Sequence, residues 1–152
     1  MAKARWTLLA VSGPNLQLLG KREPDIYGTT TLAQIHRALV KRGRELNARV
    51  VTRQSNIEGE LVTWVGEAGS AFDGILINPG AYTHTSIALL DAISASELPT
   101  IEVHLSNPDA REAFRRRSRI AQACLGRIAG FGPLSYTLAL EGLVRMLENA
   151  GR

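Results

Sequence analysis

The sequence predicts an α/β protein in which helices cover both faces of a doubly wound, mostly parallel sheet. Two observations carry this prediction: short apolar runs recur along the chain, and segments with helical periodicity separate them. The 152 residues, of which 45% are hydrophobic, suffice for one well-buried domain and are too few for two ordinary ones. We therefore expect a single domain spanning residues 1–152.

Strands are expected where short runs are rich in β-branched or aliphatic residues. In chain order these runs span residues 7–11, 49–52, 74–77, 100–103 and 125–129. Their alternation with five helical segments implies right-handed crossovers and a parallel sheet. The order of the strands does not follow from the sequence, but five strands favour the flavodoxin-like arrangement.

Helix starts are indicated by capping residues. Thr31 and Ser55 are each followed three residues later by Gln or Glu, the spacing of a capping box. Asn107 is followed by a proline, which predicts another start because asparagine caps helices and proline fits their first position. The other two helices are expected at about residues 84–94 and 135–148.

Composition narrows the classes of function. The net charge of +4 comes from 15 arginines against three lysines, which favours planar, bidentate recognition of anions. Nucleic acid is not an expected partner, because aromatic residues make up only 5% of the chain and do not alternate with the arginines. The first apolar run, residues 8–11, is too short for a signal peptide or a membrane span, and Cys124 is the single cysteine. We expect a cytoplasmic protein with no membrane association, in which Cys124 belongs to the core.

Polar or glycine-rich residues follow every predicted strand. These segments are Ser12–Asn15, Gln54–Asn56, Asn78–Gly80, His104–Asn107 and Gly130–Gly132. Each alone is typical of a turn or a helix cap. Because the carboxyl ends of parallel strands meet at one edge of the sheet, where doubly wound proteins bind ligands, together they predict a binding crevice.

Acid–base chemistry is indicated at two places near this edge. Arg22 and Tyr27 share the loop after the first strand, and a tyrosine beside an arginine can act as a base because the cation favours the phenolate. Glu102 and His104, two residues apart on a strand, lie on one face, so the acid can orient and charge the imidazole. A surface or capping pair explains the Glu102–His104 spacing equally well.

Binding residues are indicated beside the same strand ends. His84, in a polar segment at a helix start, is placed to contact a ligand hydroxyl. Arg111, Arg115 and Arg119 are spaced to form one stripe on the predicted helix after Asn107, and its first two arginines can reach an anion. His36, inside a helix without an evident partner, is interpreted as structural.

Motifs in five groups share the pattern and order of a known family. They are Ser12-Gly13-Pro14-Asn15-Leu16; Arg22-Glu23-Pro24 with Tyr27-Gly28; Arg53-Gln54-Ser55-Asn56 with Glu58-Gly59; Asn78-Pro79-Gly80-Ala81 with Thr83-His84-Thr85-Ser86; and Glu102-Val103-His104-Leu105-Ser106-Asn107 with Arg111-Glu112 and Phe114-Arg115. Together they resemble type II 3-dehydroquinate dehydratase over nearly the whole chain. The sequence departs from the family pattern at Gln17, Ile57, Leu90 and Arg117, none of which carries an implied catalytic role.

The resemblance implies a hydro-lyase in a single catalytic domain that needs no cofactor and no metal. The implied reaction is the reversible dehydration of 3-dehydroquinate to 3-dehydroshikimate by anti elimination through an enolate, in the shikimate pathway of aromatic amino acid biosynthesis or in quinate breakdown. Tyr27 would remove the proton beside the ketone, with Arg22 stabilising its phenolate, and Asn15 would stabilise the enolate through a water. His104, paired with Glu102, would protonate the departing hydroxyl. Because one arginine supplies only part of the stabilisation that a phenolate needs at neutral pH, Arg111 is expected to assist Arg22.

The same resemblance implies the binding contacts and the assembly. The substrate carboxylate would meet the backbone N–H groups of Leu105 and Ser106 and the side chain of Asn78. His84 and Arg115 would hold ring hydroxyls. Asp91 is similar to a residue that reaches a neighbouring subunit's site in a homo-oligomer, a dodecamer built from trimers.

A flavodoxin-like protein that binds flavin or phosphate is the alternative. Such a protein needs a loop rich in N–H groups after the first strand. Here Pro14 lacks its N–H, and the loop carries the Arg22–Tyr27 segment instead.

Overall fold

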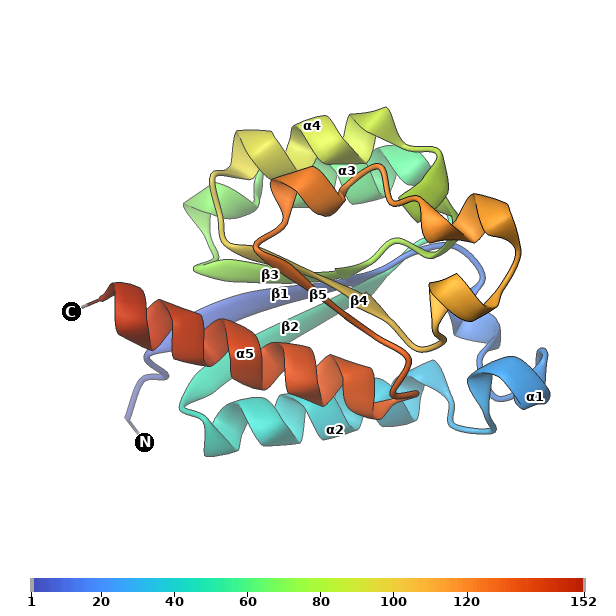
Figure 1. Ribbon diagram of the computed structural model, residues 1–152. Helices are drawn as coiled ribbons and strands as arrows, with labels where there is room; N and C mark the ends of the chain where they lie inside the picture. The colour runs from blue at the N-terminus through green and yellow to red at the C-terminus, as the bar shows by residue number, and fades with distance from the viewer. Residues whose placement is uncertain (1, 152) are drawn as a thin grey trace.

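The five strands form one parallel sheet in the order β2-β1-β3-β4-β5, as seen in a computed structural model that describes residues 2–151 (Figure 1). The strands are β1 (Trp6–Ser12), β2 (Ala48–Gln54), β3 (Gly74–Asn78), β4 (Thr100–His104) and β5 (Gly126–Ala129). This is the flavodoxin-like order, which confirms the predicted fold class. Every strand begins and ends within two residues of its predicted run.

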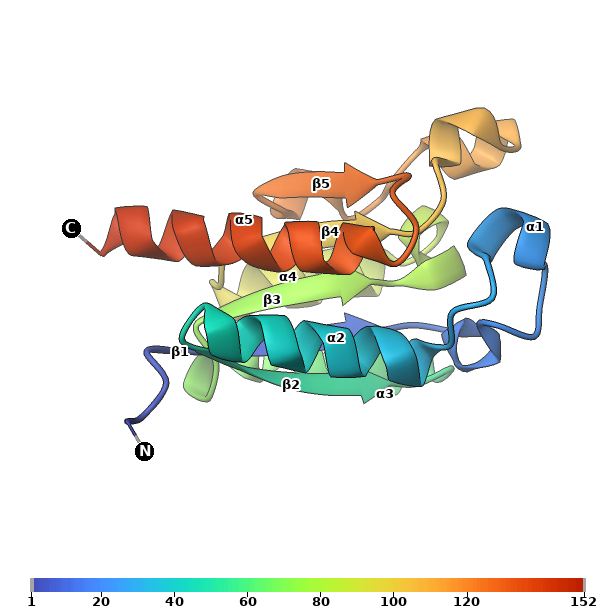
Figure 2. The ribbon, with the colours of Figure 1, turned by 90° about the horizontal axis from the view of Figure 1, so that it is seen from below.

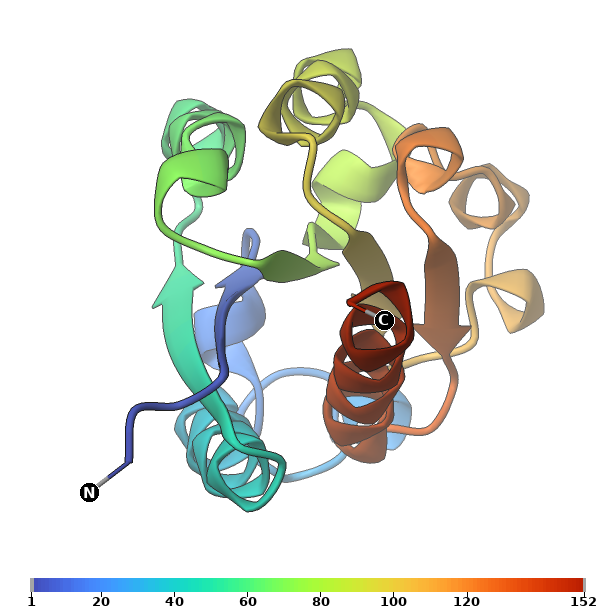
Figure 3. The same ribbon diagram turned by 90° about the vertical axis from the view of Figure 1, so that its left-hand side faces the viewer.

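Two pairs of helices cover the two faces of the sheet. The helices are α1 (Pro24–Tyr27), α2 (Leu32–Glu45), α3 (Glu58–Gly66), α4 (Ile87–Ser96) and α5 (Leu134–Ala150). Helices α2 and α5 pack on one face, and α3 and α4 on the other (Figures 1 and 3). The short α1 lies beyond the carboxyl ends of the strands (Figure 2).

The alternation of side chains along β1 divides the core in two. Leu8 is fully buried in the cluster that includes residues of α2 and α5, and its neighbour Leu9 is fully buried in the cluster that includes residues of α3 and α4. Cys124 packs against the second cluster, which confirms its prediction as a core residue. Burial raises the pKa of its thiol to about 12, so the sulfur stays uncharged.

Two of the predicted helix starts differ in the structure. Thr31 forms the expected capping box, but Ser55 does not, because its hydroxyl accepts from the N–H of Ile57 at 2.9 Å and closes a local turn before α3. Helix α4 begins at Ile87 instead of residue 84, because the Ser86 hydroxyl caps it.

The predicted helix after Asn107 is wrong. Asn107 does accept from the N–H of Asp109 at 3.1 Å, but the connection from β4 to β5 contains only short 3-10 helices at Pro108–Ala110, Ala113–Arg116 and Ala121–Ala123. Between residues 109 and 119 no side chain is buried, and Phe114 is 62% exposed, whereas helices in proteins depend on a buried apolar face. The stripe of Arg111, Arg115 and Arg119 on one α-helix therefore does not exist.

Among the described helices, none is both long enough and apolar enough to cross a lipid bilayer. His36 lies on α2, outside the pocket described below, and burial lowers the pKa of its imidazole.

Candidate active site

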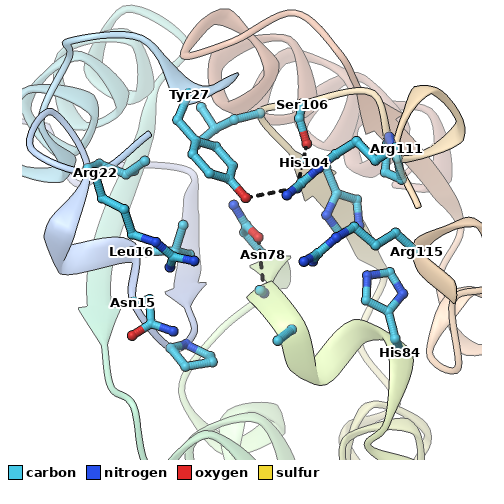
Figure 4. Close-up of a pocket in the computed structure, with 16 residues that line it drawn as sticks. Asn15, Leu16, Arg22, Tyr27, Asn78, His84, His104, Ser106, Arg111 and Arg115 are labelled. Atoms are coloured by element: carbon cyan, nitrogen blue, oxygen red, sulfur yellow. Dashed lines mark hydrogen bonds between the residues drawn. The ribbon is translucent and has the colours of Figure 1, made fainter. Parts of the chain in front are cut away.

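The carboxyl ends of β3 and β4 and the loop after β1 surround a pocket, shown in Figure 4. Its empty volume is about 800 Å³, which includes the solvent space of its open mouth. Most of the residues that the sequence predicted for the site line this pocket: Asn15, Arg22, Tyr27, Asn78, His84, His104, Leu105, Ser106, Arg111 and Arg115. Glu102 and Asp91 do not line it.

Tyr27 is positioned by α1, a single turn with a defined start and end. Pro24 occupies its first position, where the missing N–H costs nothing. Gly28 follows it with φ 77°, a conformation that glycine adopts without strain. The Tyr27 ring packs against the apolar core, and its hydroxyl points into the pocket (Figure 4).

The arginine that contacts Tyr27 is Arg111. Its Nη1 donates to the Tyr27 hydroxyl at 2.8 Å, and only 16% of its side chain is exposed. Arg22, the expected first partner, lines the pocket but pairs with Glu23 at 3.3 Å, and no hydrogen bond joins it to Tyr27 within residues 2–151. The tight turn after β4 brings Arg111 to the tyrosine, whereas the Arg22 side chain extends from an exposed loop (Figure 4).

His104 and Glu102 form the pair that their spacing predicted. Nε2 of His104 donates to Oε2 of Glu102 at 2.6 Å. Glu102 is fully buried, and its other oxygen accepts from the Ser118 hydroxyl at 2.6 Å. Nε of Arg127, on β5, lies 2.9 Å from Oε2 of the same carboxylate. The surface or capping interpretation of this pair is therefore wrong.

The electrostatics of this pair favour an ionised carboxylate. Burial alone would raise the pKa of Glu102, but the hydrogen bond and charge of His104, followed by Ser118 and Arg127, hold that pKa below its usual value. A carboxylate on Nε2 fixes the orientation of the imidazole and stabilises its protonated form. Nδ1 is then the ring nitrogen left for a ligand in the pocket.

Asn78 is held from behind by a fully buried tyrosine. Its Nδ2 donates to the hydroxyl of Tyr136 at 3.1 Å, and that hydroxyl also lies 2.9 Å from Oγ of Ser12. The Asn78 side-chain oxygen accepts from the N–H of Gly80 at 3.2 Å. Burial raises the pKa of Tyr136, so its hydroxyl keeps its proton and supports the amide without adding charge.

His84 and Arg115 face the pocket beside one another (Figure 4). Nδ1 of His84 lies 2.8 Å from the carbonyl oxygen of Arg117 and donates to it. Burial lowers the pKa of His84 despite that hydrogen bond, so its Nε2 is an acceptor for a ligand hydroxyl. Nε of Arg115 donates to Glu112 at 2.9 Å, which anchors the guanidinium.

The loop after β1 brings Asn15 to the mouth of the pocket. Asn15 has φ 67°, a left-handed conformation that asparagine tolerates, and its N–H donates to the side chain of Asn56 at 2.9 Å. A Cβ at Gly13 would lie 2.4 Å from the carbonyl oxygen of Pro79, so only glycine allows these two loops to approach.

Asp91 lies apart from these residues. It is exposed on α4 and does not line the pocket of its own chain. Its place in a neighbouring subunit's site stays a prediction.

Sequence reasoning missed three residues that support the site: Ser118, Arg127 and Tyr136. Arg127 stands directly opposite Glu102 in the β4–β5 register, so the pairing of the two predicted strands would have revealed it. Ser118 and Tyr136 reach the site by tertiary folding, and no local pattern points to them.

Comparison with known proteins agrees with this geometry. The sequence model of the family described as dehydroquinase class II matches residues 6–144. A 3-dehydroquinate dehydratase of Nostoc sp. is 56% identical over 142 residues, which are 93% of this chain and 97% of the relative. A 3-dehydroquinate dehydratase of Thermus thermophilus is 54% identical over 145 residues, 95% of this chain and 97% of the relative.

Solved structures give the same result. The crystal structure of a type II dehydroquinase from Propionibacterium acnes matches with a TM-score of 0.89 at 42% identity, covering 95% of this chain and 98% of that one. A 3-dehydroquinate dehydratase-like protein from Bifidobacterium longum matches with a TM-score of 0.71 at 29% identity, covering 94% of this chain and 98% of that one. The flavin- or phosphate-binding alternative finds no support in these relatives. By fold, site and sequence, this chain belongs to the class II dehydroquinase family.

Proposed function

We propose that this enzyme catalyses the reversible dehydration of 3-dehydroquinate to 3-dehydroshikimate through an enolate. One observation carries this proposal: two groups line the same pocket. One is a tyrosine hydroxyl that accepts a hydrogen bond from an arginine, and the other is an imidazole hydrogen-bonded to a carboxylate. One of these groups is suited to remove a proton and the other to supply one, which is what the loss of water from a β-hydroxyketone requires.

Tyr27 is the base of the first step. Its phenolate takes the proton from the carbon beside the ketone, and the electron pair of the broken C–H bond moves into the enolate. The Arg111 guanidinium, 2.8 Å from the Tyr27 oxygen, stabilises the phenolate that must form first. Asn15, at the pocket mouth, is proposed to hold a water against the enolate oxygen. Arg22 is proposed to join the site when the loop closes over substrate.

His104 is the acid of the second step. As the enolate collapses, the C–O bond to the hydroxyl breaks, and the imidazolium gives its proton to the departing oxygen so that water leaves. Glu102, 2.6 Å from Nε2, holds the ring in its orientation for the transfer.

The remaining residues are proposed to bind the substrate. Its carboxylate would meet the backbone N–H groups of Leu105 and Ser106 and the amide of Asn78, which Tyr136 fixes from behind. His84, as an acceptor, and Arg115, as a donor, would hold ring hydroxyls.

We also infer a homo-oligomer, a dodecamer built from trimers, in a cytoplasmic location. Large apolar side chains on the surface support the assembly: Ile87 is 59% exposed, Phe114 62% and Phe131 59%. Asp91 is proposed to reach a neighbouring site from α4. Light scattering would give the mass of the assembly, and a monomer at micromolar concentration would contradict it. The location rests on the single cysteine, which allows no internal disulfide.

The test of the proposed reaction is direct. Pure protein with 3-dehydroquinate should produce the ultraviolet absorbance of a conjugated enone. The absence of any rise over the spontaneous rate would end the proposal. Borohydride added with substrate should leave the enzyme active, because Tyr27 chemistry forms no imine; a substrate-dependent adduct on Lys21 would instead indicate Schiff-base catalysis.

A further inference from the structure

One oxygen of Glu102 is shared by an imidazole and a guanidinium. Oε2 accepts from Nε2 of His104 at 2.6 Å and lies 2.9 Å from Nε of Arg127. The other oxygen, Oε1, accepts from the Ser118 hydroxyl. Arg127 and the imidazole thus compete for the same atom of a fully buried carboxylate.

The Arg127 contact is electrostatic rather than a directed hydrogen bond. Its Nε and Nη2 are buried, yet neither has a hydrogen-bond partner within residues 2–151. Buried N–H donors without partners cost free energy. The register of β5 against β4 fixes it opposite Glu102, so the strand pairing itself maintains this arrangement.

The other titratable or charged groups near His104 and Glu102 do not share an acceptor with the imidazole. Arg115 bonds to Glu112, and Arg111 bonds to Tyr27. His84 donates to a backbone carbonyl, and burial lowers its pKa, so it adds no charge near neutral pH. Cys124, beside Glu102, stays a neutral thiol because burial raises its pKa to about 12.

We propose that Arg127 is a positioning residue that makes proton transfer from His104 easier, because it shares the negative charge of Glu102 with the imidazolium. The proposal rests on the proposed function, in which His104 is the proton donor. With Arg127 present, the carboxylate already has a counter-charge when the imidazole is neutral. The imidazolium also meets a second positive charge. Both effects make His104 release its proton more readily to the departing hydroxyl.

Replacing Arg127 by a neutral residue therefore has a predicted sign. In Arg127→Gln, Oε2 of Glu102 serves His104 alone, and the imidazolium is stabilised. The pH midpoint of the His104 titration should rise by about one unit, which is the lower end of the range of shifts that one neighbouring charge causes. The alkaline limb of kcat/KM should move up with it.

The experiment is an imidazole titration by NMR on the whole protein without substrate. The chain has only three histidines, so His36→Gln and His84→Gln variants identify the His104 signals. The titration is compared in wild type, Arg127→Gln, Arg127→Met, Arg127→Lys and the control Arg116→Gln, which removes an exposed arginine of the same connection. Arg127→Met is a second neutral variant in case one of the pair folds poorly.

We expect a higher midpoint in the neutral variants, a return toward wild type in Arg127→Lys, and no change in Arg116→Gln. An unchanged or lower midpoint in the neutral variants would overturn the proposal. So would a shift in Arg127→Lys as large as in Arg127→Gln, because shape rather than charge would then be responsible. Failure of the proposed function would appear separately, as wild-type protein that does not turn over 3-dehydroquinate.

Discussion

Arg111→Met tests which arginine activates the base. In the structure Nη1 of Arg111 donates to the Tyr27 hydroxyl at 2.8 Å from a side chain that is 16% exposed. A hydrogen bond to a charged group contributes about 1.5–3 kcal/mol. If that hydrogen bond stabilises the Tyr27 phenolate, loss of the bond should lower kcat/KM about 10- to 100-fold, since each 1.4 kcal/mol is a factor of ten. Methionine keeps much of the length and apolar contact of the side chain while removing the charge.

The assay is the initial rate of enone formation at several substrate concentrations. Arg116→Met is the matched control, because this arginine is exposed and does not line the pocket. It should keep wild-type kinetics, and thermal unfolding should show that both variants are folded. A loss of less than about threefold in Arg111→Met, well under 1.4 kcal/mol, would refute the assignment of Arg111 to the phenolate.

Further predictions concern the supporting groups. Tyr136→Phe should lower the unfolding free energy in urea by about 1–3 kcal/mol and raise KM, because the buried amide of Asn78 loses its acceptor; unchanged stability and KM would contradict this. The depressed pKa of Glu102 should stabilise the fold above the ordinary carboxyl pKa of about 4.3 and lose this effect as pH falls through the lower folded-state pKa. The stability difference between wild type and Glu102→Gln should therefore shrink with acidity, and a constant difference would exclude this linkage. Finally, protease cleavage at Lys21 or Arg22, both exposed, should slow when a substrate-like anion closes the loop; equal rates with and without saturating anion would indicate a rigid loop.

The sheet was predictable because its signal is local. Each strand is a short apolar run whose carboxyl end is polar, and parallel pairing then gathers those ends at one edge. That reasoning was enough to bring Asn78 and His104 into one pocket. Strand geometry predicted that Glu102 and His104 share a face, but only the structure shows that the pair is buried and not a surface or capping pair.

Contacts set by tertiary packing were not predictable in this way. The sequence predicted Arg22 as the first cation on Tyr27, with Arg111 assisting; in the structure Arg111 makes the contact and Arg22 pairs with Glu23. The predicted helix after Asn107 had a suitable cap and no apolar face, and a cap cannot compensate for missing burial. Arg127 reaches Glu102 only through the register of β5, which depends on a strand pairing that the sequence does not specify.

The division of labour between Tyr27 and His104 is the central claim, and hydrogen exchange tests it most directly. The measurement follows exchange of the abstracted hydrogen of 3-dehydroquinate with deuterated solvent, corrected for spontaneous exchange, beside the rate of enone formation. His104→Ala should still catalyse exchange while forming product slowly, because proton removal by Tyr27 precedes loss of the hydroxyl. Tyr27→Phe should lose both. Equal large losses of exchange and dehydration in His104→Ala would contradict the account, since His104 would then act before or together with the base.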